Sequence, residues 1–271
     1  MPVRLRLLLT ICIAIALTGC PSTKESTKSE EPPPSPPLPL VKKPAVPEIF
    51  VRVAAIDLSN VPRKIDTKDV AEIAELVRKK NIDILSIEGM SRYPGLKNRI
   101  DVFDEIGTAT DMRKVFGENI TVSGRQMGNA VYSTYPIRSH LTTPFEEISS
   151  ANFESALQAV IDCGVREIVV VSSRLPQQAP RGDIEKCLST IRRMNHEYVG
   201  YPIILAGNLP SDTTGGSPSP FSVVHITRSG ESERFWYSND GSLKFVSAEA
   251  ESTGVGPMTI SEFGIFRKPH P

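Results

Sequence analysis

The sequence predicts an α/β fold made of two stacked, mixed β-sheets flanked by helices, a four-layer α/β sandwich. Three observations support this: short apolar segments typical of buried strands, two amphipathic helical stretches between some of them, and turn signals that join others into hairpins. Strand–helix–strand units favour parallel pairing and hairpins are antiparallel, so both kinds of pairing are expected. We find no internal repeat at a fixed period.

The expected domain, residues 49–271, begins with a strand, a helix and a second strand. EIFVRVAAIDL is rich in residues that favour strands. Asp66 is expected to cap a helix over 65–80 whose apolar residues share one face and whose last turn is basic. IDILSIE then predicts a short buried strand, and a helix, in one or two pieces, is expected over 99–117.

The remaining elements are mostly short strands. ITVSG and NAVYST predict one pair around a turn, and SALQAVIDCG with EIVVVSSRL a second. A second helix is expected over 183–199, where Ile184, Leu188, Ile191 and Met194 share a face, followed by the buried strand PIILAG. After a Gly/Ser/Pro-rich loop, further strands are expected at FSVVHITRS, RFWYS, LKFVS and FGIF.

Residues 1–19 are expected to be a lipoprotein signal peptide. Arg4 and Arg6 precede an apolar stretch at 7–17 that suits a signal-peptide core and is short for a transmembrane helix. The stretch runs into Leu-Thr-Gly-Cys, which resembles a bacterial lipobox with Cys20 as the lipidated first mature residue. The alternative is a secreted protein in which Cys20 has no such role.

Residues 20–48 are expected to be the lipidated cysteine and a disordered tether. Ser, Thr, Lys and Glu are followed by EPPPSPPLPLVKKPAVP, which cannot bury a core and favours extended polyproline conformations. This part would reach about 40–50 Å at ~3.1 Å per residue, although a ligand for proline-recognition modules is the alternative. The predicted location is the cell envelope, with the outer membrane favoured because Pro21, and not Asp, follows the cysteine.

The charge balance argues against nucleic acid as a partner. The chain carries 31 basic and 31 acidic residues, and loss of residues 1–19 would leave it slightly acidic. No excess of Lys or Arg is present to displace counterions from a phosphate backbone. The acyl chains on Cys20 would provide the membrane contact. The sequence does not identify a protein or small-ligand partner.

Common catalytic and metal-binding motifs are absent from the sequence. There is no Walker-type loop, Cys-x-x-Cys, His-Glu-x-x-His or Gly-x-Ser-x-Gly, and the four histidines are scattered. His225 lies in an apolar strand and is expected to be a core residue. Cys163 and Cys187 are either buried thiols, the commoner outcome for isolated cysteines, or a disulfide, which an export compartment permits.

The strand order and two motifs resemble the endonuclease/exonuclease/phosphatase superfamily, which has the deoxyribonuclease-I-like fold. GNAVYSTYPI looks like that family's G-N-[AG]-hydrophobic-hydrophobic-S-x-[YF]-P-[IV] strand, and DILSIEGM resembles its strand ending in Q-E. The resemblance covers about residues 49–269. It implies hydrolysis of phosphate esters with Mg²⁺ or Mn²⁺ held by oxygen ligands, and with histidines and an Asp acting on the phosphoryl group and on water.

Three carboxylates remain at positions that match the family's site. Asp57 stands where the family's first strand ends in Asn, Glu88 keeps the metal-binding Glu, and Glu262 replaces the Asp of a terminal S-D-H. They could hold a divalent cation. The favoured alternative is that Arg174 fills the former metal position as a counter-ion of Glu88 or Asp57, because a guanidinium repels a cation and satisfies the acids.

The family's proton-transfer residues are replaced. Arg174 stands for the His of T-H-L and is always cationic, and Phe263 stands for the His of S-D-H and has no proton to exchange. Asn208 and Pro210 replace the acid and the amide of G-D-x-N, so neither can accept a proton from water. No catalytic residue set is expected to be intact.

These losses predict a lipid-anchored, non-catalytic binding or structural module of the cell envelope, without a cofactor. The alternative is an active phosphodiesterase or nuclease that uses Mg²⁺ or Mn²⁺ and a rearranged site built from Asp57, Glu88, Asp212 and Glu262. A third interpretation is that the more weakly matching strands are misaligned with the family.

Overall fold

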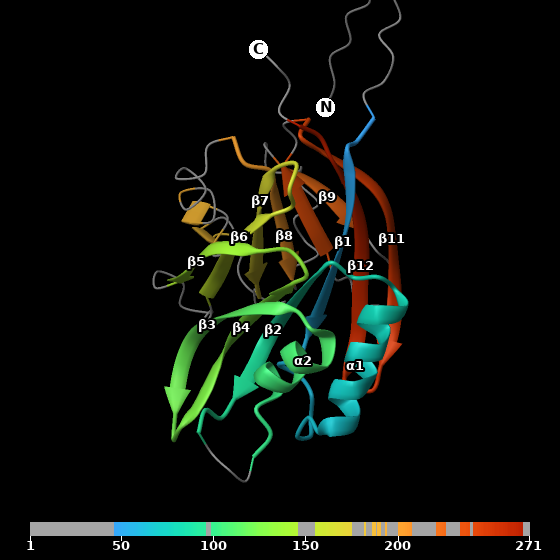
Figure 1. The fold of residues 1–271 in the computed structure, drawn as a ribbon. Helices are drawn as coiled ribbons and strands as arrows, with labels where there is room; N and C mark the ends of the chain where they lie inside the picture. The colour runs from blue at the N-terminus through green and yellow to red at the C-terminus, as the bar shows by residue number, and fades with distance from the viewer. Residues whose placement is uncertain are drawn as a thin grey trace, which may run out of the picture. The chain divides into compact units, whose positions relative to one another are not determined.

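Two six-stranded β-sheets form the framework of the domain in the computed structural model (Figure 1). The structure describes residues 46–95, 99–145, 155–174, 200–207, 221–225, 234–238 and 241–267, with six single positions between 182 and 193. The predicted signal peptide and almost all of the tether lie outside these residues. Within the described stretches, no helix is both long enough and apolar enough to cross a membrane.

Both sheets are mixed, as predicted. The first contains, in spatial order, β11 (Leu243–Thr253), β12 (Gly256–Ile265), β1 (Ile49–Asp57), β2 (Ile84–Arg92), β4 (Arg125–Ser133) and β3 (Arg113–Val122). The second contains β5 (Ile137–Pro144), β6 (Ser155–Asp162), β7 (Glu167–Ser173), β8 (Ile203–Gly207), β10 (Arg234–Ser238) and β9 (Phe221–His225). β1 pairs with β2 and β7 with β8 in parallel, and the remaining neighbours among these strands pair antiparallel.

The two helices α1 (Thr67–Lys79) and α2 (Val102–Thr110) pack on the outer face of the first sheet (Figure 1). Asp66 caps α1 as predicted, because its carboxylate accepts hydrogen bonds from the backbone N–H groups of Lys68 and Asp69. Asp69 completes a capping box by accepting a bond from the Asp66 N–H. The apolar face expected from the sequence is buried: Val70, Ile73, Ala74 and Val77.

We expect Asp69→Asn to lower the free energy of unfolding by about 1 kcal/mol at pH 7, the usual contribution of a capping interaction. Hydrogen bonding to Arg63 lowers the folded-state pKa of Asp69. The carboxylate therefore stabilises the fold above its unfolded-state pKa, and this contribution is lost as the pH falls through the folded-state pKa. In urea unfolding, the difference from wild type should shrink in acid, whereas the exposed change Glu75→Gln should have little effect at any pH. A difference independent of pH would contradict this account.

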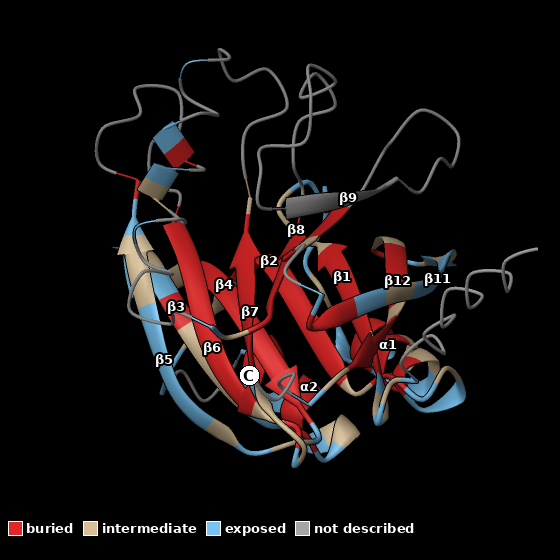
Figure 2. Cartoon of the chain, turned by 90° about the horizontal axis from the view of Figure 1, so that it is seen from above, coloured by how far each residue is buried: buried red, intermediate tan, exposed pale blue. Residues whose placement is uncertain are grey.

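Strand alternation decides which residues face the space between the sheets. On β1, Val51, Val53 and Ala55 belong to the apolar core between the sheets, whereas Ala54 and Ile56 pack toward the helices. Figure 2 shows that the central strands are buried over most of their length and that the edge strands β5 and β11 carry exposed residues. The alternation directs the last residue of β1 toward the gap between the sheets.

The structure differs from the expected elements at β3 and β5. Residues 113–117, expected to be helical, belong to β3, and β5 was not expected as a separate strand. Asp111, whose φ is 55°, caps the C-terminus of α2, and the chain then pairs with β4 from Arg113 onward. Antiparallel pairing in the β3–β4 hairpin decides the structure here over the local helical pattern. The helix expected over 183–199 lies mostly outside the described residues, and so do the four residues of its predicted face.

No disulfide joins the two described cysteines, Cys163 and Cys187, and both are buried. Burial raises the pKa of the Cys163 thiol to about 12. Because the thiolate is the nucleophile, we expect iodoacetamide at pH 8 to alkylate Cys163 at least ~100-fold more slowly in the folded chain than in urea. Peptide mapping by mass spectrometry measures this ratio. Equal rates in both states would contradict the burial of the thiol.

Candidate functional site

Asp57 and Glu88 lie side by side at the ends of two parallel strands. β1 and β2 are in register so that Asp57 pairs with Glu88. Glu88 follows Ile84 and Ser86 on the face of β2 that points between the sheets, and its exposed fraction is 1%. A bulge that contains Glu88 and Gly89, whose φ is 64°, interrupts the pairing of β2 with β4 between Ile87 and Met90. Parallel pairing thus brings together two acids that are 31 positions apart in the sequence.

Arg174 approaches this pair from the second sheet. It follows the last residue of β7, and its Nε lies 3.4 Å from Oδ2 of Asp57. The expected ion pair is therefore present, with Asp57 as a partner. Its side chains are 24% and 9% exposed, so solvent screens it less than it screens a surface pair.

Hydroxyl groups occupy further positions around both carboxylates. Oδ1 of Asp57 accepts hydrogen bonds from the backbone N–H of Ser59 at 2.8 Å and from its hydroxyl at 2.5 Å. Oε1 of Glu88 accepts bonds from Ser86 Oγ at 2.8 Å and from Ser172 Oγ at 3.4 Å. The carboxylate oxygens that a cation would use thus already accept hydrogen bonds from the protein.

The described residues do not fit a divalent cation at this position. Arg174 places its guanidinium against one oxygen of Asp57, and Ser59 donates twice to the other. A metal ion would have to displace a cationic group from its carboxylate partner and compete with two hydrogen bonds. In the described part of the chain, no group of three or more His, Cys, Asp or Glu side chains could hold a metal ion.

Glu262 and Phe263 do not lie at the site, contrary to the sequence-based prediction. Glu262 pairs with Arg52 across β12 and β1, and its Oε2 accepts hydrogen bonds from the Arg52 guanidinium at 3.2 and 3.3 Å. Arg52 is five residues from Asp57 along β1, roughly 17 Å at ~3.3 Å per residue. Phe263 is fully buried in the core between the sheets, opposite Val51.

This placement favours the third interpretation, a misaligned strand, for β12. The residues of β12 nearest to Asp57 are at its beginning: Met258 pairs with Ile56, and a Cβ built on Gly256 would lie 3.8 Å from the Asp57 carbonyl oxygen. No histidine occurs at 254–258. In the sequence, residues 259–265 form one continuous strand-like run. This run places the tripeptide Ser-Glu-Phe in mid-strand, and it is the signal that could have corrected its match to the family's S-D-H.

β8, the strand that precedes the positions matching the family's G-D-x-N, ends next to Glu88. β8 ends at Gly207, and a Cβ built there would lie 3.2 Å from Oε1 of Glu88 and 2.0 Å from the Ser173 carbonyl oxygen. The predicted site positions Asn208 and Pro210, together with Asp212, lie outside the described residues.

A buried polar layer beside Glu88 was not predicted. Ser86 Oγ lies 2.8 Å from Ser172 Oγ, so the hydroxyls of the two sheets meet directly. The amide of Asn129 donates to the Ser155 carbonyl at 3.0 Å, and its oxygen accepts from the Gly89 N–H at 3.4 Å. The signal in the sequence was a polar residue inside each of three apolar strands: Ser86 in β2, Asn129 in β4 and Ser172 in β7. Ser86 and Ser172 each stand two positions before a charged residue, Glu88 and Arg174, and therefore share a face with it.

Comparison with known proteins supports the fold through structure alone. No family model and no curated protein matches the sequence. An endonuclease/exonuclease/phosphatase from Beutenbergia cavernae superimposes with a TM-score of 0.60 at 15% identity, covering 80% of this chain and 72% of that one. One from Bacteroides vulgatus gives 0.59 at 9%, covering 80% and 100%. The human Nocturnin catalytic domain with bound sulfate gives 0.59 at 10%, covering 81% and 94%.

These similarities agree with the two-sheet architecture. At such low identity they establish the architecture and leave activity open. The chain therefore has the fold of the endonuclease/exonuclease/phosphatase proteins.

Proposed function

We propose that this chain is a membrane-anchored lipoprotein whose endonuclease/exonuclease/phosphatase-like domain is a non-catalytic binding or structural module of the cell envelope. The observation that carries the proposal is the ion pair between Arg174 and Asp57. In the proposed state, a fixed protein cation takes the electrostatic role that a metal ion has in the related enzymes. Arg174 cannot act as a general base, so the same residue removes two functions at once.

The replacement of histidines supports the proposal independently. The sequence has no histidine at the T-H-L position, where Arg174 stands, and none in the stretch of β12 beside Asp57. Members of a catalytic set act together, so loss of one typically costs several orders of magnitude in rate. The fold is kept while the groups that move protons are missing, as expected for a module selected for binding or structure.

Hydrolysis of phosphate esters tests the proposal. The full chain in neutral detergent would be incubated with bis-p-nitrophenyl phosphate, DNA or phosphoinositides in the presence of Mg²⁺ or Mn²⁺. We expect no turnover above that of Glu88→Gln, because the wild-type site lacks the groups that this variant would disable. Turnover that is lost in Glu88→Gln would support the alternative, an active metal-dependent phosphoesterase with a rearranged site.

The anchor has its own test, since it rests on the N-terminal motif alone. Expression in bacteria fed a radiolabelled fatty acid should label the chain and place it in the membrane fraction. Cys20→Ser should abolish the label, because the thiol is the proposed acceptor. Labelling that survives this substitution would contradict lipidation at Cys20.

A further inference from the structure

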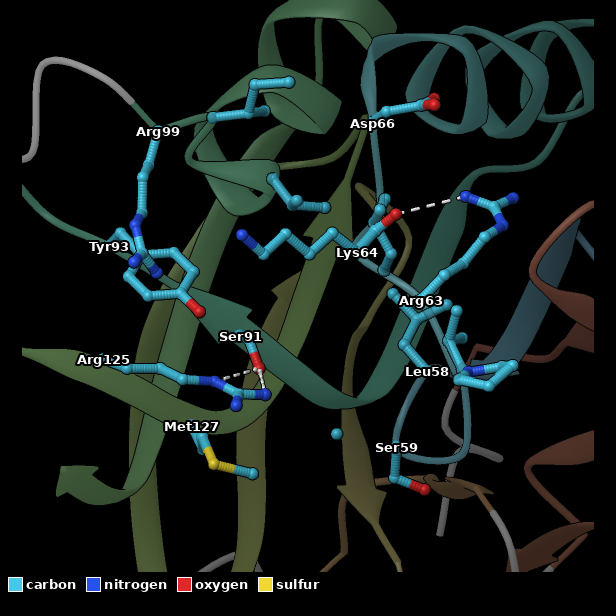
Figure 3. Close-up of a pocket in the computed structure, with 16 residues that line it drawn as sticks. Leu58, Ser59, Arg63, Lys64, Asp66, Ser91, Tyr93, Arg99, Arg125 and Met127 are labelled. Carbon is cyan, nitrogen blue, oxygen red and sulfur yellow. Dashed lines mark hydrogen bonds between the residues drawn. The ribbon is translucent and has the colours of Figure 1, made fainter.

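A pocket of about 570 Å³ lies next to the Asp57–Glu88 pair, in the size range of small-molecule sites. Its walls come from the loop between β1 and α1, from β2 and the loop that follows it, and from the start of β4 (Figure 3). Ser59 and Gly89 belong to its wall, whereas Asp57, Glu88 and Arg174 do not. The pocket is therefore a neighbour of the altered site and has its own set of residues.

The rim of this pocket carries more positive than negative charge. Four cationic side chains line it, with Asp66 as the one lining acid. Arg63 is bound through two hydrogen bonds to Asp69, so its charge is compensated. Among the described residues, no ion pair involves Lys64, Arg99 or Arg125. Oδ1 of Asp66 is directed to the N-terminus of α1, where it accepts two backbone hydrogen bonds.

Two of these cations are held in position by neutral partners. Nε and Nη2 of Arg125 donate to Ser91 Oγ at 3.1 and 2.7 Å, which orients the guanidinium without neutralising it. The guanidinium of Arg99 lies 4.5 Å from the centre of the Tyr93 ring. In Figure 3, Lys64 extends from the opposite wall toward Tyr93 and Arg99. The positive groups thus border one common space.

The interior of the pocket is apolar. Lys64, Arg99 and Arg125 are exposed, whereas Leu58 and Val102 are buried. Met127, Ile65 and Ile100 are half-buried and line the same space. A charged rim above an apolar floor suits a ligand that has an anionic head and an apolar body.

We propose that this pocket binds a small organic anion, with a phosphate or carboxylate head between Lys64, Arg99 and Arg125 and an apolar or aromatic body against Met127 and Leu58. Arg presents several donors to such a head, and Lys adds a mobile point charge. The inference names the ligand class of the binding module proposed above and in that sense rests on it. It does not require Asp57, Glu88 or Arg174 to take part.

Binding of 1-naphthyl phosphate, followed by calorimetry, tests the inference with the full chain in neutral phosphatidylcholine vesicles. Inorganic phosphate, which lacks the apolar body, and 1-naphthol, which lacks the anionic head, should each bind at least ~10-fold more weakly. The double variant Lys64→Gln/Arg125→Gln should weaken binding ~10-fold or more, since it removes two charge-assisted contacts. Arg125→Lys should retain part of the affinity, which separates loss of charge from loss of folding.

Arg113→Gln is the matched control, because Arg113 is an exposed arginine of β3 whose guanidinium donates to the Thr134 carbonyl away from the pocket. It should bind like wild type. Equal binding by wild type and the double variant, or no binding by wild type, would overturn the pocket inference and leave the proposed function standing. Release of 1-naphthol that is lost in Glu88→Gln would instead overturn the non-catalytic proposal, whether or not the pocket binds.

The anionic head could belong to a free molecule or to a lipid headgroup. Displacement of 1-naphthyl phosphate by vesicles containing phosphatidic acid, but not by neutral vesicles, would support the same site with a lipid phosphate as its source. Binding that is insensitive to phosphatidic acid would support a soluble anion.

Discussion

Phe263→Ala is expected to lower the free energy of unfolding by about 3–5 kcal/mol, the range for removing a large buried aromatic side chain. Phe263 is fully buried and contacts three aromatic rings: the ring centres of Tyr237, Phe235 and Phe245 lie 5.5, 6.2 and 6.2 Å away. Alanine would leave a cavity between the sheets that the surrounding strands cannot close. Urea unfolding monitored by circular dichroism measures the change.

Two further variants decide whether this position belongs to the core or to the site. Phe50→Ala, one residue away on the paired strand and 49% exposed, should cost far less. Phe263→His restores the residue type that the family resemblance suggests, but it places an imidazole among apolar rings. It should destabilise the fold by at least about 2 kcal/mol and produce no hydrolysis. A stable Phe263→His variant that hydrolyses phosphate esters would contradict the core position of Phe263.

Gly207→Ala is expected to destabilise the domain by about 3 kcal/mol or more. The residue has a φ of 152°, and an added Cβ would lie 2.0 Å from the Ser173 carbonyl oxygen and 3.2 Å from Oε1 of Glu88. Both the backbone strain and the overlap with a neighbouring strand oppose the methyl group. The variant therefore tests the close approach of β8 to β7 beside the carboxylate pair, and the loss should appear as a lower urea midpoint.

Gly164→Ala is the matched control for this substitution. Gly164 also has a positive φ, 82°, but among the described residues, apart from Gly164 and its two chain neighbours, no heavy atom lies within 4 Å of the point that an added Cβ would occupy. Its replacement should cost only the conformational strain of about 1–2 kcal/mol. Equal losses in the two variants would show that contact with Ser173 contributes nothing.

Local signals in the sequence predict a large part of this fold. The cap at Asp66 and the apolar face of α1 follow from residue spacing alone, and the parallel strands at 49–57 and 84–92 follow from short apolar runs separated by a helix. The pairing of Asp57 with Glu88 could be anticipated for the same reason: the carboxyl ends of neighbouring parallel strands meet at one edge.

What could not be predicted depends on register between distant segments. The tripeptide at 261–263 matches a site motif in residue type, yet antiparallel pairing with β1 sets Glu262 against Arg52 and Phe263 against Val51. A few residues of slip along a strand move a side chain by more than ~10 Å at ~3.3 Å per residue. The pocket beside Lys64 and Arg125 was missed for a related reason, because its walls come from three separated segments.

The central claim, that Arg174 and not a metal ion is the counter-ion of Asp57, is tested most directly by calorimetric titration of Mg²⁺ and Mn²⁺ into the full chain. We predict no binding by the wild type below millimolar concentrations, and tighter binding by Arg174→Gln, which leaves both carboxylates without the guanidinium. Tight binding of either cation by the wild type that disappears in Glu88→Ala would contradict the account.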